Sequence, residues 1–192
     1  MRAVAERSIH LMADGTLEGL REVVHPDATN REAANEPPDC RGTGPEAFWA
    51  TALWLRSAYS DLAFTVETAV VDDDLVVTYG TMSGRHTGDF TVWTPEGRVE
   101  RAFAPTGKRF EVHHAHFLRM RGDLVVEHWA VRDDQGQALQ LGWIPPTPVY
   151  LLRCAVATRR ARRAAGSVGG VSYPRAAEGM ERGDAWTGRN VR

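Results

Sequence analysis

Cysteine is scarce in this chain of 192 residues: Cys40 and Cys154 are the only two, and they lie far apart. A disulfide framework is therefore not expected, and the C-x-x-C spacing of structural metal sites is absent. Glu6 and Arg7 stand where a signal peptide would have its apolar stretch, and no apolar run approaches the roughly 20 residues of a membrane span. These absences predict a reduced, cytoplasmic protein.

The chain also lacks the short motifs of several common catalytic classes. It contains no G-x-S-x-G, P-loop or G-x-G-x-x-G sequence, so serine hydrolysis and nucleotide chemistry have no support. The formal net charge of −2 argues against a nucleic-acid binder. The charge is uneven, however: residues 1–149 carry 14 basic and 22 acidic residues, whereas residues 150–192 carry 9 and 3. An acidic body and a basic end are expected to do different jobs.

The composition, 43% apolar and 25% charged, is that of a globular chain. Apolar residues at helical spacing predict helices over residues 4–13, 17–24 and 45–59, with a long loop at 27–45. From residue 62 the apolar period changes to two, which predicts strands at 62–70, 75–82, 90–93, 99–103, 108–121 and 124–133. Helices followed by a run of strands indicate an α+β fold rather than alternating βαβ units.

The C-terminal part of the chain differs in composition from the rest. Three prolines at positions 145, 146 and 148 close a domain over residues 1–147, and a basic helix is predicted at 148–165. The Gly-, Ser- and Arg-rich remainder, 166–192, is predicted to be disordered. The helix could make a weak contact with an anionic membrane or a partner through the arginines and Leu151, Leu152, Ala155 and Val156. A solvated helix packed loosely on the domain is the simpler interpretation.

The hairpin of the last two predicted strands is the most informative segment. If its arms pair across a turn at Gly122, one face carries Val112, His114, His116, Leu118 and Met120, opposite Val125, Glu127, Trp129, Val131 and Asp133. The other face, predicted to meet solvent, carries Glu111, His113, Arg119, Arg121, His128 and Arg132. A few polar groups on an apolar concave surface are typical of a small-molecule pocket, and such surroundings raise the pKa of a carboxyl group.

Each polar residue of that face also has a simpler interpretation. His114 and His116 could be hydrogen-bonded core histidines, and Trp129 could be core or pocket wall. Asp133 could begin a turn, and Glu127 could pair with an arginine. Metal binding by His86, His113, His114 and His116 is a less favoured alternative, because His113 points away from its neighbours and the spacing determines no third ligand.

Ordered motifs along the chain resemble those of the SnoaL-like polyketide cyclase, or ester cyclase, family over roughly residues 5–146. They are GRHTG at 84–88, PTGK at 105–108, EHW at 127–129 with Asp133, and QLG at 140–142. The resemblance implies a nuclear-transport-factor-two-like cone, in which a strongly curved, mostly antiparallel sheet wraps around N-terminal helices and encloses a pocket. It also implies a homo-oligomer assembled through the outer sheet face.

The resemblance further implies ring closure of a small hydrophobic polyketide-like substrate by intramolecular aldol condensation, without metal or organic cofactor. Asp133 matches the family's general acid/base, and the nearest candidates for assisting groups are His86, His114, His116 and Asn30. Relatives often have His where this chain has Arg31, and an acidic residue where it has Ala130. On this hypothesis Asp133 removes a proton between two carbonyl groups, and His116 or His114 steadies the oxygen that gains charge.

Two other classes of function stay open at the sequence level. A hydratase, isomerase or epoxide hydrolase of the same fold would use further polar groups, to which Arg31 and Tyr79 could contribute. A non-catalytic module would bind an apolar ligand without converting it. The candidate substrate-binding residues are His86, Trp129, Asn30, Arg31 and Tyr79.

Overall fold

The computed structural model describes residues 1–168 of the chain. Its first elements are the helices α1 (Arg2–Asp14), α2 (Leu17–Arg21) and α3 (Gly44–Ala58). Thr16 separates the first two, because its side-chain oxygen accepts a hydrogen bond from the Gly19 amide and so caps α2. All three predicted helices are present, although α2 is shorter than its apolar spacing suggested. None of the helices within residues 1–168 is long and apolar enough to cross a membrane.

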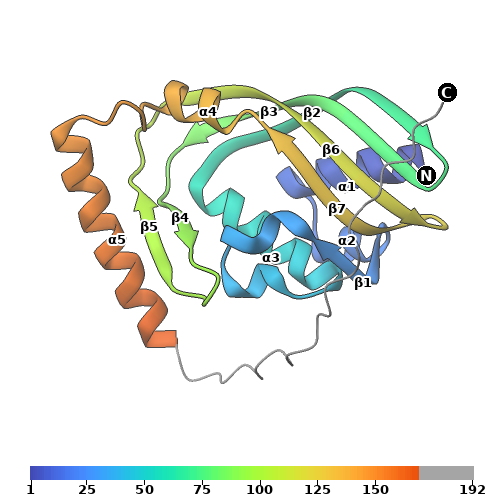
Figure 1. Cartoon of the computed structure of the whole chain (residues 1–192), viewed down its shortest axis with the longest axis horizontal. Coiled ribbons are helices and arrows are strands. Elements are labelled where there is room, and N and C mark those ends of the chain that lie inside the picture. The colour runs from blue at the N-terminus through green and yellow to red at the C-terminus, as the bar shows by residue number, and fades with distance from the viewer. Residues whose placement is uncertain (169–192) are drawn as a thin grey trace, which may run out of the picture.

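The strands form a five-stranded sheet and a separate pair. The sheet has the order β1-β7-β6-β3-β2, in which only β1 and β7 run parallel. Its strands are β1 (Val24–Asn30), β2 (Tyr59–Asp72), β3 (Leu75–His86), β6 (Arg109–Arg121) and β7 (Leu124–Arg132). The pair consists of β4 (Phe90–Trp93) and β5 (Val99–Phe103). Figure 1 shows the long strands β2, β3 and β6 arching over α1 and α3, which confirms the predicted α+β fold with helices inside a curved sheet.

Strand β1 lies where the sequence pattern predicts a loop. It occupies the edge of the sheet beside β7, so Pro26, which has no N–H group to donate, does not interrupt an inner ladder. The two 3-10 helices η1 (Arg31–Asn35) and η2 (Pro38–Arg41) follow it. A parallel partner almost a hundred residues away leaves no local signature, which is why the apolar pattern misses this strand.

The last helix, α5, covers the second sheet. Helix α4 (Asp134–Leu141) follows β7, and α5 (Pro148–Val168) extends three residues beyond the predicted helix end at 165. The edge of β5 is capped by side chains of α5, because the Ala102 amide donates to Thr158 Oγ1 at 2.8 Å and Tyr150 Oη donates to the Ala104 carbonyl at 3.0 Å. The rest of the predicted tail, residues 169–192, lies outside the described residues.

Candidate active site

The last hairpin pairs with a register that differs from the predicted one. Arg119 pairs with Glu127, but the next residue, Met120, pairs with Val125. Val126 is therefore an extra residue in β7, a β-bulge, and every side chain after it points to the opposite face from the one predicted. The predicted inward positions of Glu127, Trp129 and Val131 are consequently wrong.

Beyond the bulge, three residues that were not expected to face the pocket point inward. His128 lies opposite Leu118, Ala130 opposite His116, and Arg132 opposite His114 on the concave face. The inward orientation predicted for the β6 residues is confirmed, whereas the solvent positions predicted for His128 and Arg132 are wrong. The bulge thus places a third imidazole and a guanidinium beside the two expected histidines.

Trp129 and Arg31, both predicted to bind substrate, lie outside the cavity on the outer face of the sheet. The Trp129 ring stacks on Phe117 with centroids 5.3 Å apart, and the Arg31 guanidinium lies 4.6 Å from the Trp129 centroid. Arg31 also forms an ion pair with Glu127. Tyr79 belongs to the same outer face, because it stacks on His113 at 5.3 Å and is 43% exposed.

His86 is fully buried, but among core residues rather than in the cavity. Its Nδ1 accepts a hydrogen bond from Trp143 Nε1 at 3.3 Å, and its ring packs against those of Tyr59 and Trp143. Burial lowers the pKa of His86 to about 4, so the ring is neutral at ordinary pH. This contact explains the residue as part of the core between α5 and the sheet.

Asp133 caps a helix and faces solvent. Strand β7 ends at Arg132, and Asp133 becomes the N-cap of α4, where its Oδ1 accepts a hydrogen bond from the Gly136 amide at 2.8 Å. The side chain is exposed and does not line the cavity. The prediction that Asp133 shares the apolar face is therefore wrong, since the chain leaves the strand at this residue.

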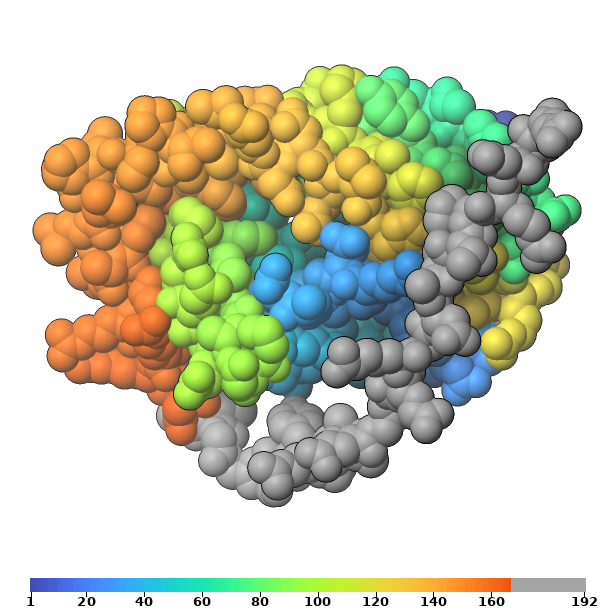
Figure 2. All heavy atoms as spheres, in the orientation of Figure 1, coloured from blue at the N-terminus to red at the C-terminus, as the bar shows by residue number. Residues whose placement is uncertain are grey.

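A cavity of about 130 Å³ lies between the helices and the concave face of the sheet. Its apolar walls are formed mainly by Ile9, Met12, Phe48, Trp54, Leu55, Phe64, Met82, Phe90 and Leu118. Figure 2 shows the surface hollowed between the segments of η1, β4 and β7, all of which contribute residues to the lining. An apolar enclosure with a few polar groups is the arrangement that orients a small organic ligand.

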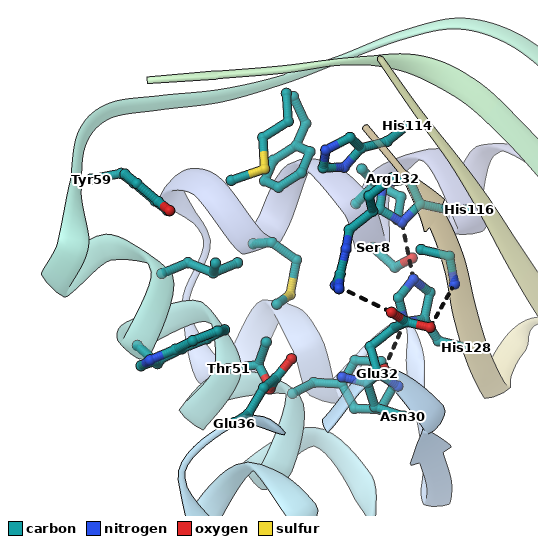
Figure 3. Close-up of a pocket in the computed structure, with 18 of the residues that line it drawn as sticks. Ser8, Asn30, Glu32, Glu36, Thr51, Tyr59, His114, His116, His128 and Arg132 are labelled. Atoms are coloured by element: carbon teal, nitrogen blue, oxygen red, sulfur yellow. Dashed lines mark hydrogen bonds and ion pairs between the residues drawn. The ribbon is translucent and has the colours of Figure 1, made fainter. Parts of the chain in front are cut away.

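Three polar side chains form a hydrogen-bonded chain along one wall (Figure 3). Asn30 Oδ1 lies 2.9 Å from His128 Nδ1, and His128 Nε2 lies 3.0 Å from His116 Nδ1. Asn30 Oδ1 also accepts a hydrogen bond from the Glu32 amide at 3.1 Å, which identifies this atom of the Asn30 side chain as the oxygen. Because an oxygen of this kind only accepts, His128 Nδ1 must carry the proton that is donated to it.

The protonation of His116 follows from that of His128. A neutral His128 that donates through Nδ1 accepts through Nε2, so His116 donates through its Nδ1. The remaining nitrogen, His116 Nε2, is then an unprotonated acceptor, and it has no hydrogen-bond partner among the described residues. Asn30 therefore determines, through one intervening ring, which nitrogen of His116 is available to a ligand.

Burial keeps these imidazoles neutral. It lowers the pKa of His116 to about 3 and that of His114 to about 4, and it lowers the pKa of His128 well below its ordinary value. The positive charge of Arg132 adds to each of these shifts, while the Asp133 carboxylate partly offsets the one at His114. Both ring nitrogens of His114 lack partners among the described residues, so one N–H donor is available to a ligand.

Arg132 is held at the cavity by two carboxylates. Its Nη1 lies 3.2 Å from Glu32 Oε2, and its Nε lies 3.3 Å from Asp134 Oδ1. Glu32 also accepts a hydrogen bond from the Ala130 amide at 3.1 Å, so η1 and β7 are joined on one side of the cavity (Figure 3). The guanidinium is thus a fixed positive charge at the site.

Glu36 is a buried carboxyl group of the cavity that the sequence pattern does not reveal. It follows η1, lines the cavity and is only 4% exposed. Thr51 of α3 donates a hydrogen bond from Oγ1 to Glu36 Oε2 at 2.5 Å. Burial raises the pKa of Glu36, although the Thr51 hydrogen bond and the charge of Arg132 oppose the increase. Glu36 lies in a Pro- and Asn-rich segment without apolar periodicity, so the sequence does not predict that its side chain is buried.

The ligating side chains of the described segment do not form a metal cluster. Within residues 1–168, no group of three or more His, Cys, Asp or Glu side chains is placed to hold one ion.

Residues 2–141 match the family described as SnoaL-like polyketide cyclase. This chain belongs to the SnoaL-like polyketide cyclase family. All residues that line the cavity lie inside the matched range, whereas α5 lies outside it. The resemblance drawn from the sequence motifs is therefore confirmed.

Two curated relatives are aklanonic acid methyl ester cyclases. DnrD of Streptomyces peucetius is 27% identical over 146 residues, which span 76% of this chain and 92% of DnrD. DauD of Streptomyces sp. (strain C5) is 27% identical over 158 residues, which span 82% of this chain and 91% of DauD. Family and relatives together support a cyclase role for this SnoaL-like chain.

Solved structures of similar fold support the assignment of this chain to the family's fold. TsrD from Streptomyces laurentii superposes with a TM-score of 0.57 at 25% identity, covering 74% of this chain and 97% of TsrD. IdmH from Streptomyces antibioticus superposes with a TM-score of 0.55 at 27% identity, covering 72% of this chain and 98% of IdmH. The fold of this SnoaL-like protein is the nuclear-transport-factor-two-like cone that its motifs implied.

Proposed function

We propose that this SnoaL-like protein closes a carbon ring in a polyketide-like ester by intramolecular aldol condensation. The observation that carries the proposal is the composition of the cavity. An apolar enclosure holds three neutral imidazoles, one fixed guanidinium and a buried carboxyl group. These are the groups that a reaction between two carbonyl-bearing arms of one molecule requires, namely a proton acceptor and hydrogen-bond donors for oxygen that gains charge.

The reaction begins when a carboxylate removes a proton from a carbon that lies between two carbonyl groups. The electron pair of the broken C–H bond passes into an enolate, whose carbon then attacks a second carbonyl carbon of the same molecule. A C–C bond forms, and the carbonyl electron pair moves to its oxygen, which takes up the proton. Because both arms belong to one substrate, the cavity accelerates the step chiefly by folding that substrate into the attack geometry.

Arg132 and His114 are suited to stabilise the negative oxygens of this sequence. The guanidinium is already positioned by Glu32 and Asp134, so it needs little reorganisation when charge develops. His114 offers one N–H donor from a neutral ring. His116 Nε2 differs from both, because it accepts rather than donates and is therefore suited to a substrate hydroxyl or enol group.

The resemblance implies an acid/base role for Asp133, and for this residue we propose a different role. An exposed carboxylate that caps α4 would have to give up its bond to the Gly136 amide before it could reach a ligand in the cavity. Its negative charge does act on His114. We therefore propose Asp133 as a positioning residue that influences His114, rather than as the group that touches the substrate.

Incubation with aklanonic acid methyl ester tests the proposed reaction. We expect a ring-closed product, identified by mass spectrometry and NMR, that does not form with heat-denatured protein. Binding of the ester without any product would favour a ligand-binding module. A product that has gained the mass of water would favour a hydratase or epoxide hydrolase of the same fold. Either result would overturn the cyclase proposal for this substrate.

Contact of α5 with a membrane or a partner also stays a proposal. The helix exposes Val149 and Leu152, each about two-thirds or more accessible, and carries arginines in its C-terminal half. Co-sedimentation with vesicles containing anionic phosphatidylserine should decrease when Leu152 is changed to Glu. Equal sedimentation of the two proteins would remove the membrane from the proposal.

A further inference from the structure

Several carboxyl groups lie in or near the cavity, and they differ in what surrounds them. Glu32 is paired with Arg132 at 3.2 Å and accepts a hydrogen bond from the Ala130 amide. Asp134 is paired with Arg132 as well, and its side chain is 68% exposed. Both carboxylates are therefore already engaged with Arg132, which they hold in place at the cavity.

Glu36 has different surroundings. Among residues 1–168 no ion pair includes Glu36, and the hydroxyl group of Thr51 is the donor that its carboxylate oxygen contacts most closely, at 2.5 Å. The thiol of Cys40, itself buried, is a second polar group beside Glu36, and the charge of Arg132 acts on the carboxylate without forming an ion pair. Desolvation outweighs these stabilising interactions, so burial raises the pKa of Glu36 and its carboxylate binds a proton more strongly than one in water.

The backbone of Glu36 is held in place from both sides. Its amide donates to the Ala33 carbonyl at 3.1 Å. Its carbonyl accepts from Arg41 Nε at 3.0 Å and from Arg41 Nη2 at 2.8 Å, and Arg41 continues to the Thr94 carbonyl at 2.8 Å. Arg41 therefore ties the segment of Glu36 to the turn between β4 and β5. A general base must be positioned in advance in this way.

The place of Glu36 in the cavity completes the geometry. Figure 3 shows Glu36 and Thr51 on the side of the pocket that lies across from His114 and His116. A substrate between these walls would have a carboxylate on one side and the imidazoles and Arg132 on the other. Proton removal and oxyanion stabilisation then act on opposite sides of the same carbon framework, as enolate formation requires.

We infer that Glu36 is the catalytic residue that removes the proton from the carbon acid and later returns it to the new alkoxide. This inference rests on the proposed function and names the base within it. The Glu36 carboxylate becomes a neutral acid when it takes the proton, while the C–H electron pair forms the enolate. After the C–C bond forms, the acid gives its proton to the carbonyl oxygen that has become negative, so that no other reagent is consumed. Thr51 is a positioning residue that orients the carboxylate.

The first experiment separates proton removal from ring closure. Wild-type protein and Glu36→Gln are incubated in deuterated water with aklanonic acid methyl ester, and deuterium entry at the acidic carbon is followed by NMR alongside product formation. We expect both rates to decrease by about 10²–10⁴ in Glu36→Gln, the usual contribution of a general base. Glu46→Gln, which removes an exposed carboxyl group of α3, should leave both rates unchanged. Wild-type rates in Glu36→Gln would overturn the inference.

A second experiment does not depend on turnover. The phenolate of 4-nitrophenol resembles an enolate, and its absorbance reports its ionisation. At mildly alkaline pH the charged Glu36 carboxylate of the wild type repels this anion, whereas the amide of Glu36→Gln imitates the neutral acid that follows proton removal. We expect Glu36→Gln to bind the phenolate at least about tenfold more tightly, a difference of about 1.4 kcal/mol. Equal or weaker binding would contradict the inference.

The two experiments also distinguish failure of the inference about Glu36 from failure of the proposed function. If wild type forms no ring from the ester, the proposed function fails for that substrate, and phenolate binding still decides the role of Glu36. If Glu36→Gln does not fold, judged by circular dichroism, Thr51→Val replaces it. Loss of the hydroxyl group that stabilises the carboxylate should move the acidic limb of the kcat/KM profile to higher pH, and an unmoved limb would overturn the inference.

Discussion

His116 Nδ1 lies 3.0 Å from His128 Nε2, on a concave face that the two rings share. This contact links the cavity to Asn30 at the end of β1, because His128 donates from its other nitrogen to Asn30 Oδ1. The nitrogen that His116 presents to a ligand is consequently determined by an amide two side chains away. Such a chain of partners orients and selects a tautomer in the same manner as the outer contacts of many catalytic histidines.

The first prediction concerns this tautomer. In ¹⁵N NMR spectra we expect His116 and His128 both to carry hydrogen on Nδ1 at neutral pH. Asn30→Asp keeps the accepting oxygen but adds a negative charge beside His128, which should raise the pKa of His128 and favour its protonated form. A protonated His128 donates through Nε2, so His116 should then carry its hydrogen on Nε2. His10, exposed on α1, is the internal control; unchanged His116 signals would contradict the proposed relay.

The second prediction distinguishes helix capping from catalysis at Asp133. Because Asp133 caps α4, Asp133→Ala should lower the free energy of unfolding by about 1 kcal/mol, whereas Asp133→Asn should retain most of it, since Asn is also a good N-cap. We expect turnover by Asp133→Asn to decrease less than about tenfold, because the carboxylate acts through His114. Chemical denaturation and initial rates measure the two effects. A loss of about 10²–10⁴ in a stably folded Asp133→Asn protein would restore Asp133 as the base.

The third prediction concerns the fixed charge at the cavity. Arg132→Met should lower kcat/KM by about 10²–10³, the range observed when a preorganised oxyanion donor is removed. Arg132→Lys keeps the charge but cannot contact Glu32 and Asp134 with one planar group, so an intermediate loss is expected. Steady-state kinetics measure both. Adding Glu32→Gln to Arg132→Met should recover stability but not turnover; recovery of turnover would show that Arg132 has only a structural role.

The fourth prediction is a dependence of stability on pH. Burial lowers the pKa of His116 to about 3 in the folded protein, while the unfolded chain has an ordinary value near 6.5. The unfolded chain therefore binds the extra proton first, and stability decreases as the pH falls from about 6.5 toward about 3. One such group contributes a slope of about 1.4 kcal/mol per pH unit. His116→Asn should flatten the profile of unfolding free energy in this window, and an unchanged slope would contradict the buried, neutral assignment.

The fifth prediction concerns the outer sheet face, where the family resemblance implies assembly. Val131 is 66% exposed and Tyr79 is 43% exposed on that face, near the stacked rings of Phe117 and Trp129. We propose that a second copy of the chain covers these side chains. Light scattering after size-exclusion chromatography should show an oligomer that Val131→Glu converts to a monomer, while Val149→Glu on α5 does not. A wild-type monomer at all protein concentrations would contradict assembly through this face.

Much of the fold could be predicted from local patterns. The alternation of apolar residues in β6 predicts which of its side chains point inward, and His114 and His116 do so. The change of period near residue 60 correctly marks where α3 ends and β2 begins. The apolar pattern does not predict α4, because Asp133 is compatible both with the last position of a strand and with the N-cap of a helix.

The candidate site depended more on contacts between distant segments. A single extra residue at Val126 inverts the rest of β7, and alternation continues on either side of it, so the sequence contains no sign of where the register changes. Glu36 lies in a loop without periodicity, and only the approach of α3 and the β4–β5 turn buries it. The family motifs identified the cyclase family, but they assigned its general acid/base role to Asp133, which is exposed in the structure.

The sequence by itself determined the α+β class, the family and the inward row of β6, because apolar period and short motifs are local properties of the chain. Tertiary structure alone decided that His128 and Arg132 join that row, that Trp129 and Tyr79 lie outside, and that Glu36 is the buried carboxyl group. The reason is physical: burial and strand register arise from segments up to a hundred residues apart, and desolvation acts on a carboxyl group only after those segments have closed around it.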